Sequence, residues 1–233
     1  DLKSGRVIGF ETLLRWNSKE HGSVPPGKFI PLAEQHQLIV PIGIWVLEQA
    51  CIFARKISRL GFPDVRVAVN LSPKQLADEN LIREVARILG SSGIAARQLE
   101  LEITESALLA SIEDSSRKLH QLDALGVRLA LDDFGTGYSS LTYLRLFPVE
   151  TLKIDKTFID NIPERETVLV QSLIRFAQSL EMSVVAEGVE RQEQWAYLQE
   201  CGCDVGQGFL ICRPTSDEDA IRFLLDKNRP ELG

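Results

Sequence analysis

Short apolar runs rich in β-branched residues alternate with longer amphipathic stretches along almost the whole chain. Seven runs have the length and composition of buried strands, at residues 6–14, 66–71, 99–104, 127–131, 151–154, 183–186 and 204–210. Stretches with helical spacing separate most of them, at residues 42–60, 80–89, 115–125, 166–180 and 192–200. Strands joined by helical crossovers lie parallel, so the sequence predicts an α/β protein with a parallel sheet.

Eight strand–helix units close a TIM barrel, whereas seven strands are visible here. Two explanations fit: an unusual barrel, or a first strand upstream of Asp1. We favour the second, because the polar residues 1–6 are typical of a hairpin turn, which implies an antiparallel strand before it. We therefore expect a modified TIM-like (β/α) barrel. No Pro- or Ser-rich linker divides the chain, so residues 1–233 are expected to form one domain.

Charge and hydropathy exclude several kinds of partner. The net charge is −7 and the basic residues form no stripe, so we expect no nucleic-acid polymer as ligand. The longest apolar stretch, residues 38–47, contains Pro41 and is shorter than the about 20 residues of a membrane span, so we expect no membrane contact by this domain. Four cysteines without Cys-x-x-Cys spacing favour reduced, buried thiols: Cys51, Cys201, Cys203 and Cys212.

Acidic side chains end nearly every predicted strand. In parallel barrels the functional groups occupy the carboxyl ends of the strands. These ends carry, in chain order, Glu11 and Arg15, Asn70, Glu102, the pair Asp132 and Asp133, Lys153, Glu187 with Glu190, and Gln207. A single acidic residue at a strand end is more often a solvated charge or a helix cap. The recurrence at so many strand ends is much harder to explain in that way.

Carboxylates that converge at one barrel mouth repel one another unless cations neutralise them. Hard oxygen ligands select magnesium or manganese rather than zinc. Two such ions about 4 Å apart are the usual device for splitting a phosphodiester bond. A lone lysine after a strand is normally a surface residue, but Lys153 inside an acidic ring can orient a nucleophilic water.

At these residues the chain resembles the EAL domain family, the cyclic di-GMP phosphodiesterases named after a Glu-Ala-Leu signature. The resemblance is carried by residues 11–16, 26–34, 69–72, 102–106, 131–141, 152–159, 185–190 and 206–214. It implies hydrolysis of the bacterial second messenger cyclic di-GMP to linear pGpG by a two-metal mechanism. In two respects the chain departs from the family pattern: Thr12 replaces the alanine, and the Tyr-Gln-Pro segment that normally ends the first strand is not part of this sequence.

The resemblance also assigns roles to the residues at the strand ends. The metal ligands would be Glu11, Asn70, Glu102, Asp132 and Asp133, with Asp132 bridging two ions. Lys153 and Glu187 would position and deprotonate the attacking water. Substrate contacts would come from Leu14, Arg15, Glu190 and Gln207. The ions would be Mg²⁺ or Mn²⁺, and Ca²⁺ is expected to inhibit, because its larger radius and looser coordination misplace the water.

Three functions from different classes remain open: an active hydrolase, an inactive receptor that binds cyclic di-GMP, and a scaffold that keeps only the fold. Every expected acidic position is filled, which favours the hydrolase.

The resemblance further implies a homodimer whose contact face lies near the glycine-containing loop from Phe134 to Ser140 and the helix that follows this loop. That loop matches neither a Walker motif nor a dinucleotide fingerprint, and it begins Phe134, Gly135, Thr136 and Gly137. We expect a cytoplasmic location, either free or as the cytosolic part of a membrane-anchored protein. An upstream sensor or cyclase-like domain is expected in the parent protein.

Overall fold

A computed structural model describes residues 1–135, 144–164 and 167–228. Two compact units make up the chain. The first, here the N-terminal unit, comprises Gly9–Arg128. The second, here the C-terminal unit, comprises Asp1–Ile8 together with Leu129–Gly233.

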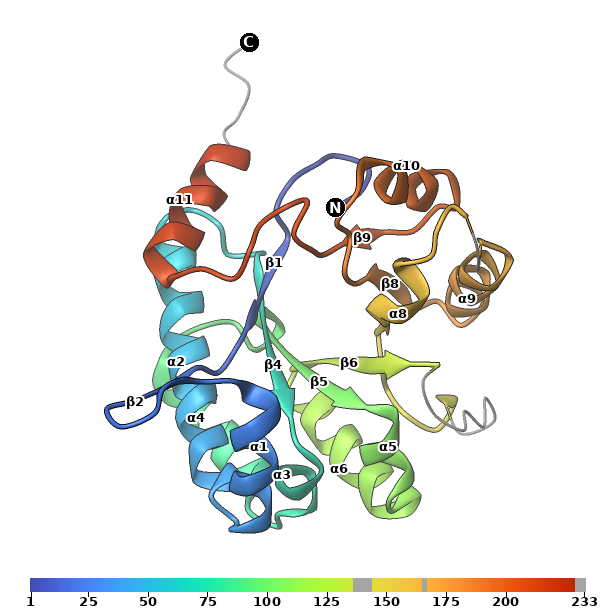
Figure 1. Ribbon diagram of the computed structural model, residues 1–233. Coiled ribbons are helices and arrows are strands. Elements are labelled where there is room, and N and C mark those ends of the chain that lie inside the picture. The colour runs from blue at the N-terminus through green and yellow to red at the C-terminus, as the bar shows by residue number, and fades with distance from the viewer. Residues whose placement is uncertain (136–143, 165–166, 229–233) are drawn as a thin grey trace. The chain divides into compact units, whose positions relative to one another are not determined.

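The N-terminal unit is built on three neighbouring parallel strands, β1 (Gly9–Thr12), β4 (Arg66–Leu71) and β5 (Leu99–Thr104). Its helices are α1 (Pro26–Gln35), α2 (Ile39–Arg59), α3 (Pro73–Ala77), α4 (Leu81–Ser92), the 3-10 turn η1 (Ala96–Gln98), α5 (Glu105–Leu109) and α6 (Ile112–Ala124). A small antiparallel hairpin, β2 (Trp16–Ser18) and β3 (Gly22–Val24), follows β1. Figure 1 shows these elements in blue to green.

Helix α2 shows why this unit holds together. Its buried residues recur every three or four positions, which places them on one face of the helix: Ile39, Gly43, Leu47, Ala50, Cys51, Ala54 and Ile57. That face packs on β4 and α4, and β4 itself contributes four buried apolar residues, Val67, Ala68, Val69 and Leu71. Burial of such a face contributes roughly 25 cal/mol for each Å² of apolar surface removed from water.

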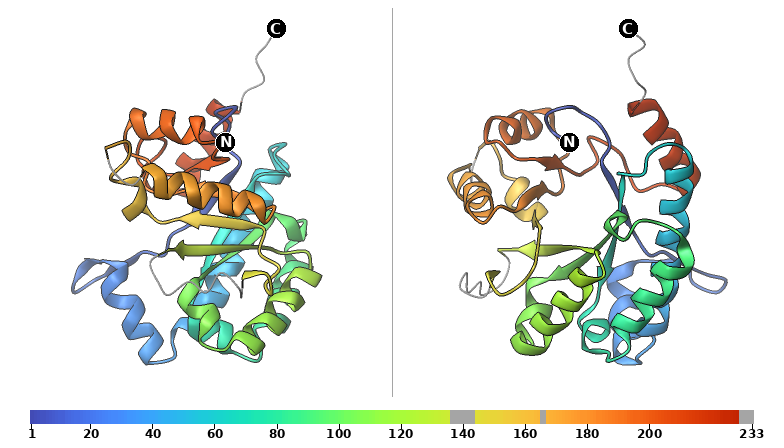
Figure 2. Two further views of the ribbon diagram at one scale, coloured as in Figure 1. Left: turned by 90° about the vertical axis from the view of Figure 1, so that its right-hand side faces the viewer. Right: turned by 180° about the vertical axis from the view of Figure 1, so that it is seen from behind.

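The C-terminal unit continues the same pattern with β6 (Arg128–Phe134), β7 (Thr151–Ile154), β8 (Ser183–Ala186) and β9 (Val205–Gly206), all paired in parallel. Its helices are α8 (Lys156–Ile159), α9 (Thr167–Ser179), α10 (Gln192–Glu200) and α11 (Asp217–Lys227). Helix α9, orange in Figure 2, runs beside β7 and β8 and packs on both. Strands β7 and β8 are buried along nearly their whole length, as parallel strands covered on both faces are.

The first eight residues belong to the C-terminal unit. Leu2 is 1% exposed, and its backbone N–H donates to the carbonyl oxygen of Asp204 at 2.9 Å. The predicted turn at residues 1–6 is confirmed, because the N–H of Gly5 donates to the carbonyl of Asp1 at 2.9 Å and Gly5 has a φ of 69°. Glycine adopts a positive φ more readily than any other residue.

The predicted strands at 66–71, 99–104, 151–154 and 183–186 are confirmed residue for residue. The first and last are shorter than predicted and the fourth extends to Phe134. The β2–β3 hairpin was not predicted from the sequence. None of the helices in the described part of the chain combines the length and apolar content that crossing a membrane requires.

Candidate active site

Three side chains of the predicted metal set lie on one face of the N-terminal unit's sheet. In the strand register Glu11 pairs with Ala68, and Asn70 pairs with Glu102. Side chains alternate along a strand, so Ala68 and Asn70 face the same side, and the paired residues face it with them. The amide Nδ2 of Asn70 donates to Oε1 of Glu11 at 2.7 Å. The structure therefore brings Glu11 and Asn70 together at the carboxyl ends of their strands.

Thr12 replaces the signature alanine without disturbing this arrangement. It follows Glu11 on the strand and so points to the opposite face. Its hydroxyl donates to the backbone carbonyl of Ala68 at 2.8 Å, a bond that alanine cannot make. The substitution adds a link between β1 and β4 and leaves the Glu11 carboxylate where it is.

A β-bulge sets the two aspartates of the C-terminal unit. Leu131 pairs with Leu152 and Phe134 pairs with Ile154, so two residues of β6 stand opposite the single residue Lys153 of β7. Asp133 has a φ of 55°, and its N–H donates to Oδ1 of Asp132 at 3.0 Å. In a regular strand two consecutive side chains point to opposite faces, whereas a bulge with one residue in the left-handed region can bring them to the same side.

Lys153 lies between two carboxylates. Its side chain is 2% exposed, and its Nζ lies 2.7 Å from Oε1 of Glu187 and 3.3 Å from Oδ1 of Asp132. A buried ammonium is retained only where neighbouring charges and hydrogen bonds replace its water. The geometry thus confirms that Lys153 is an interior residue of the acidic cluster and not a surface lysine.

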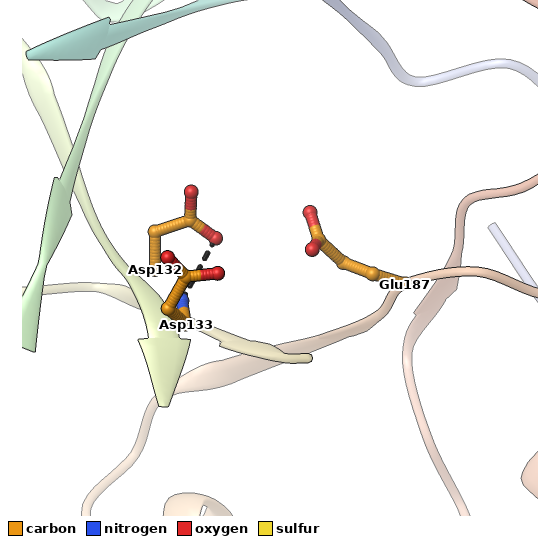
Figure 3. Close-up of side chains that lie close together, drawn as sticks. All are labelled: Asp132, Asp133 and Glu187. Carbon is orange, nitrogen blue, oxygen red and sulfur yellow. Dashed lines mark hydrogen bonds between the residues drawn. The ribbon is translucent and has the colours of Figure 1, made fainter. Parts of the chain in front are cut away.

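Asp132, Asp133 and Glu187 together could hold a metal ion. One carboxylate oxygen of each lies within 4.8 Å of the others, and Figure 3 shows the three side chains converging on the same space. Three hard oxygen donors suit an ion such as magnesium or manganese, and they do not suit a soft ion that prefers thiolate ligands. The donor set therefore fits the type of metal that the sequence predicts.

Helix caps follow directly on three of the strands that carry site residues. Ser72 caps α3, Thr104 caps α5 and Asp155 caps α8, in each case by a side-chain oxygen that accepts a backbone N–H of the helix. Each cap lies two residues after a site residue, at positions 70, 102 and 153. The chain therefore turns into a helix as soon as the site side chain has been presented, which fixes its backbone.

Glu190 and Gln207 lie on the neighbouring loops of the C-terminal unit. The N–H of Gln207 donates to the carbonyl of Ala186 at 2.9 Å, next to Glu187. The Glu190 carboxylate accepts from Nζ of Lys156 at 2.6 Å, and this hydrogen bond lowers the pKa of the Glu190 carboxyl and raises the pKa of Lys156. Lys156 was not predicted as a neighbour of the site, because a lysine one residue after an aspartate near a strand end carries no signal of its own.

Leu14 and Arg15 lie in the N-terminal unit, after β1. Arg15 is exposed, and its Nη1 donates to the carbonyl of Leu14 at 3.0 Å. That contact occupies one of the five N–H groups of the guanidinium. The hairpin that follows is anchored by an edge-to-face contact of Trp16 with Phe29, with ring centroids 5.8 Å apart.

The predicted loop after Asp133 begins later than expected. Phe134 is the last residue of β6, is 2% exposed and stacks on Phe176 of α9, with ring centroids 6.3 Å apart. Gly135 has a φ of 94°, and a Cβ there would lie 3.0 Å from the ring of Phe158. Thr136 and Gly137 lie outside the described residues.

Comparison with known proteins agrees with this geometry. A profile described as "EAL domain" matches residues 1–214. The solved structure of the PaMucR phosphodiesterase in complex with c-di-GMP is 42% identical to this chain, with a TM-score of 0.88 over 91% of this chain and 87% of that one. The EAL domain of Mycobacterium smegmatis DcpA is 31% identical, with a TM-score of 0.81 over 99% and 94% of the two chains.

Two curated proteins have similar sequences. Cyclic di-GMP phosphodiesterase NbdA of Pseudomonas aeruginosa is 44% identical over 91% of this chain and 28% of its own length. Cyclic di-GMP phosphodiesterase PdeR of Escherichia coli is 38% identical over 90% of this chain and 32% of its own length. The chain thus spans about a third or less of the curated relatives it matches.

The parallel α/β architecture is that of the TIM-like barrels to which solved EAL domains belong, so the predicted fold class is confirmed. The chain belongs to the EAL domain family.

Proposed function

We propose that this domain hydrolyses one phosphodiester bond of cyclic di-GMP and releases the linear dinucleotide pGpG. The observation that carries the proposal is the buried Lys153 ammonium held between the carboxylates of Glu187 and Asp132. The relatives named above as cyclic di-GMP phosphodiesterases, and the solved phosphodiesterase complex, support the same substrate and reaction.

The reaction needs a proton acceptor, and Glu187 has the right surroundings. Water attacks phosphorus, one P–O bond forms, and the bond to the leaving 3′ oxygen breaks. The proton of the attacking water passes to the base, and the leaving oxygen takes up a proton from solvent water to become the 3′ hydroxyl. The Lys153 ammonium lies 2.7 Å from Oε1 of Glu187 and places a positive charge beside this carboxylate. Lys153 also holds the carboxylate in one orientation through this contact.

Divalent ions fit the residues present. In the C-terminal unit Asp132, Asp133 and Glu187 offer the clustered oxygens. In the N-terminal unit the side chains of Glu11 and Asn70, joined by the bond from Nδ2 of Asn70 to Oε1 of Glu11, offer further oxygens. When bound, two such ions activate a water and stabilise the charge that develops on phosphate. We propose that Mg²⁺ or Mn²⁺ fills this role, with Glu102 as a further ligand, and that Ca²⁺ inhibits.

Substrate contacts are proposed for residues of both units. The exposed guanidinium of Arg15 offers a forked donor to a phosphate, beside the Leu14 carbonyl that it already contacts. Glu190 and Gln207 lie on the loops that follow β8 and β9 in the C-terminal unit. We propose that they contact the dinucleotide.

A homodimer is a further part of the proposal. Helix α9 carries two exposed apolar side chains, Val168 at 77% and Leu169 at 44%, and its Phe176 stacks on Phe134 at the end of β6. A contact through this helix would reach the strand that carries both aspartates. Sedimentation that shows a fully active monomer at high concentration would rule the dimer out.

The main test is direct. The purified protein is incubated with cyclic di-GMP and MgCl₂, and the products are separated by chromatography. We expect linear pGpG, its loss with EDTA, and its inhibition by CaCl₂. Binding of cyclic di-GMP without any cleavage would favour the receptor function instead.

A second test concerns the base. Glu187→Gln removes the proton acceptor and keeps the size of the side chain, so the rate should fall by about two to four orders of magnitude while cyclic di-GMP still binds. If Glu187→Gln cleaves at the parental rate, the base is another residue.

A further inference from the structure

A buried glutamine in the first turn of α10 joins two loops of the C-terminal unit. Gln194 is 1% exposed. Its Oε1 accepts the backbone N–H groups of Glu190 and Arg191, both at 2.8 Å, and its Nε2 donates to the carbonyl of Ile159 at 2.9 Å. The bonds to Glu190 and Arg191 belong to the capping box at the start of α10, and the bond to Ile159 joins the same amide to a second segment of the chain.

The two segments are the exits of the strands that carry the proposed catalytic pair. Ile159 ends α8, the helix that follows β7 and its Lys153. Glu190 lies three residues after Glu187, which itself follows β8. Gln194 thus links the chain just beyond Lys153 to the chain just beyond Glu187.

Further contacts bind the same two segments. Nη2 of Arg191 donates to the carbonyls of Asp160 at 2.9 Å and Ile162 at 2.6 Å. Gly188, with a φ of 69°, lies so close to the Lys156 stem that a Cβ there would be 2.4 Å from Cγ of Lys156. The two segments are therefore packed as one body, with the Gln194 amide buried at its centre.

Glu187 is consequently held on both sides. Its own N–H donates to the carbonyl of Ile154 at 3.1 Å, which ties its start to β7. Beyond it, the N–H of Glu190 is held by Gln194. A carboxylate that must meet a water and an ammonium within a few tenths of an ångström benefits from such a fixed backbone.

We propose that Gln194 is a positioning residue for hydrolysis, which keeps the Glu187 carboxylate against Lys153 through its bonds to the β7 and β8 exits. This inference rests on the proposed function. Gln194 touches neither substrate nor metal in this role, so its loss should lower kcat and leave the substrate KM nearly unchanged.

The test compares Gln194→Met with Gln98→Met. Gln98 is also buried, at 2% exposure, and bonds to Ser58 in the N-terminal unit, so its loss removes a similar buried amide elsewhere. We expect Gln194→Met to lower kcat by about 100-fold with KM within about twofold of the parent. Gln98→Met should lower the free energy of unfolding and leave kcat unchanged.

A parental kcat in Gln194→Met would overturn the inference, and so would an equal loss of kcat in both variants, because the effect would then follow stability alone. If Gln194→Met does not fold, Gln194→Glu replaces it. That variant still accepts the two N–H groups but cannot donate to Ile159, so a smaller fall in kcat is expected, and no fall contradicts the inference. Absence of pGpG with the parent protein would instead refute the proposed function.

Discussion

The two sets of candidate site residues are built in different ways. In the N-terminal unit Glu11 and Asn70 lie on strands with uninterrupted register, and one amide–carboxylate bond joins them. In the C-terminal unit the cluster depends on a bulge, a non-glycine residue at positive φ and a lysine that is 2% exposed. The bulge, the positive φ and the buried charge each cost free energy, and neighbouring residues must offset that cost.

This difference predicts how substitutions divide between the two units. A site residue on a regular strand can be replaced with little change in packing, so its loss should affect function and spare stability. A residue that sustains a bulge or neutralises buried carboxylates should affect both. Substitutions in the acidic cluster of the C-terminal unit are therefore expected to change both catalytic activity and the free energy of unfolding.

Lys153→Met should have the largest effect. The change removes the ammonium and leaves the carboxylates of Asp132 and Glu187 without it, and breaking a buried ion pair costs about 3–5 kcal/mol. Urea unfolding in EDTA should show this loss, and hydrolysis should be abolished. Asn70→Ala is the control, and its free energy of unfolding should change by less than about 0.5 kcal/mol. Similar losses in both variants would refute the comparison.

Gly43→Ala tests whether the N-terminal unit can lose stability without losing activity. A Cβ at position 43 would lie 1.8 Å from Nε2 of Gln75, a buried residue of the capping box at α3. Overpacking of this kind costs about 1–3 kcal/mol. Thermal unfolding should show a lower Tm, while kcat per folded molecule stays at the parental value. A fall in kcat at temperatures well below the Tm would show that this packing also reaches the site.

Asp133→Asn separates the charge from the backbone conformation. Asparagine tolerates positive φ, so the free energy of unfolding should change by less than about 0.5 kcal/mol, whereas the affinity for Mn²⁺ should fall by about tenfold. Asp133→Ala loses the same carboxylate and should cost about 1 kcal/mol more, because alanine disfavours this conformation. Calorimetric titration and urea unfolding measure the two effects. Equal stability of the two variants would mean that the bulge is not strained.

The labelling rates of two buried thiols should show the smallest of the expected effects, and each thiol reports on the opening of its own unit. Burial raises the pKa of Cys51 to about 11 and the pKa of Cys203 to about 12, so at pH 8 both are protonated and react only when their unit opens. Mn²⁺ at ten times its Kd should slow labelling of Cys203 by about tenfold. Cys51, in the N-terminal unit, should be slowed less. Mass spectrometry measures the labelling rate of each thiol. If Mn²⁺ slows the labelling of both thiols equally, metal binding stabilises the two units alike.

The sequence predicted regular features well, because their periodicity extends over enough residues. The strand at 66–71 is mostly apolar, and the strand at 99–104 alternates apolar residues with Glu100 and Glu102. Helix α10 spans residues 192–200 as its pattern indicates. Helices α3, α5 and α8 have five, five and four residues, fewer than a helical pattern needs in order to be recognised. These helices were therefore not predicted, although each begins three residues after a site residue.

The candidate site was predictable in composition but not in geometry. Paired aspartates at a strand end are visible in the sequence, yet nothing in Asp132-Asp133 indicates that the strand runs on to Phe134 through a bulge. Burial of Lys153 depends on two carboxylates from neighbouring strands, which only the folded sheet supplies. Gln194 has no signal at all, because a glutamine at the start of an amphipathic helix is normally solvated.

The attachment of the first eight residues to the C-terminal unit has a consequence for the order of folding. The Asn228 side chain accepts the N–H of Val7 and donates to the carbonyl of Val7, both at 2.8 Å, across 221 positions of sequence. Residues 9–128 are thus nested inside the chain of the other unit. A ribosome delivers the whole nested unit before Asn228 exists, so we expect the N-terminal unit to form first and residues 1–8 to wait for the last helix.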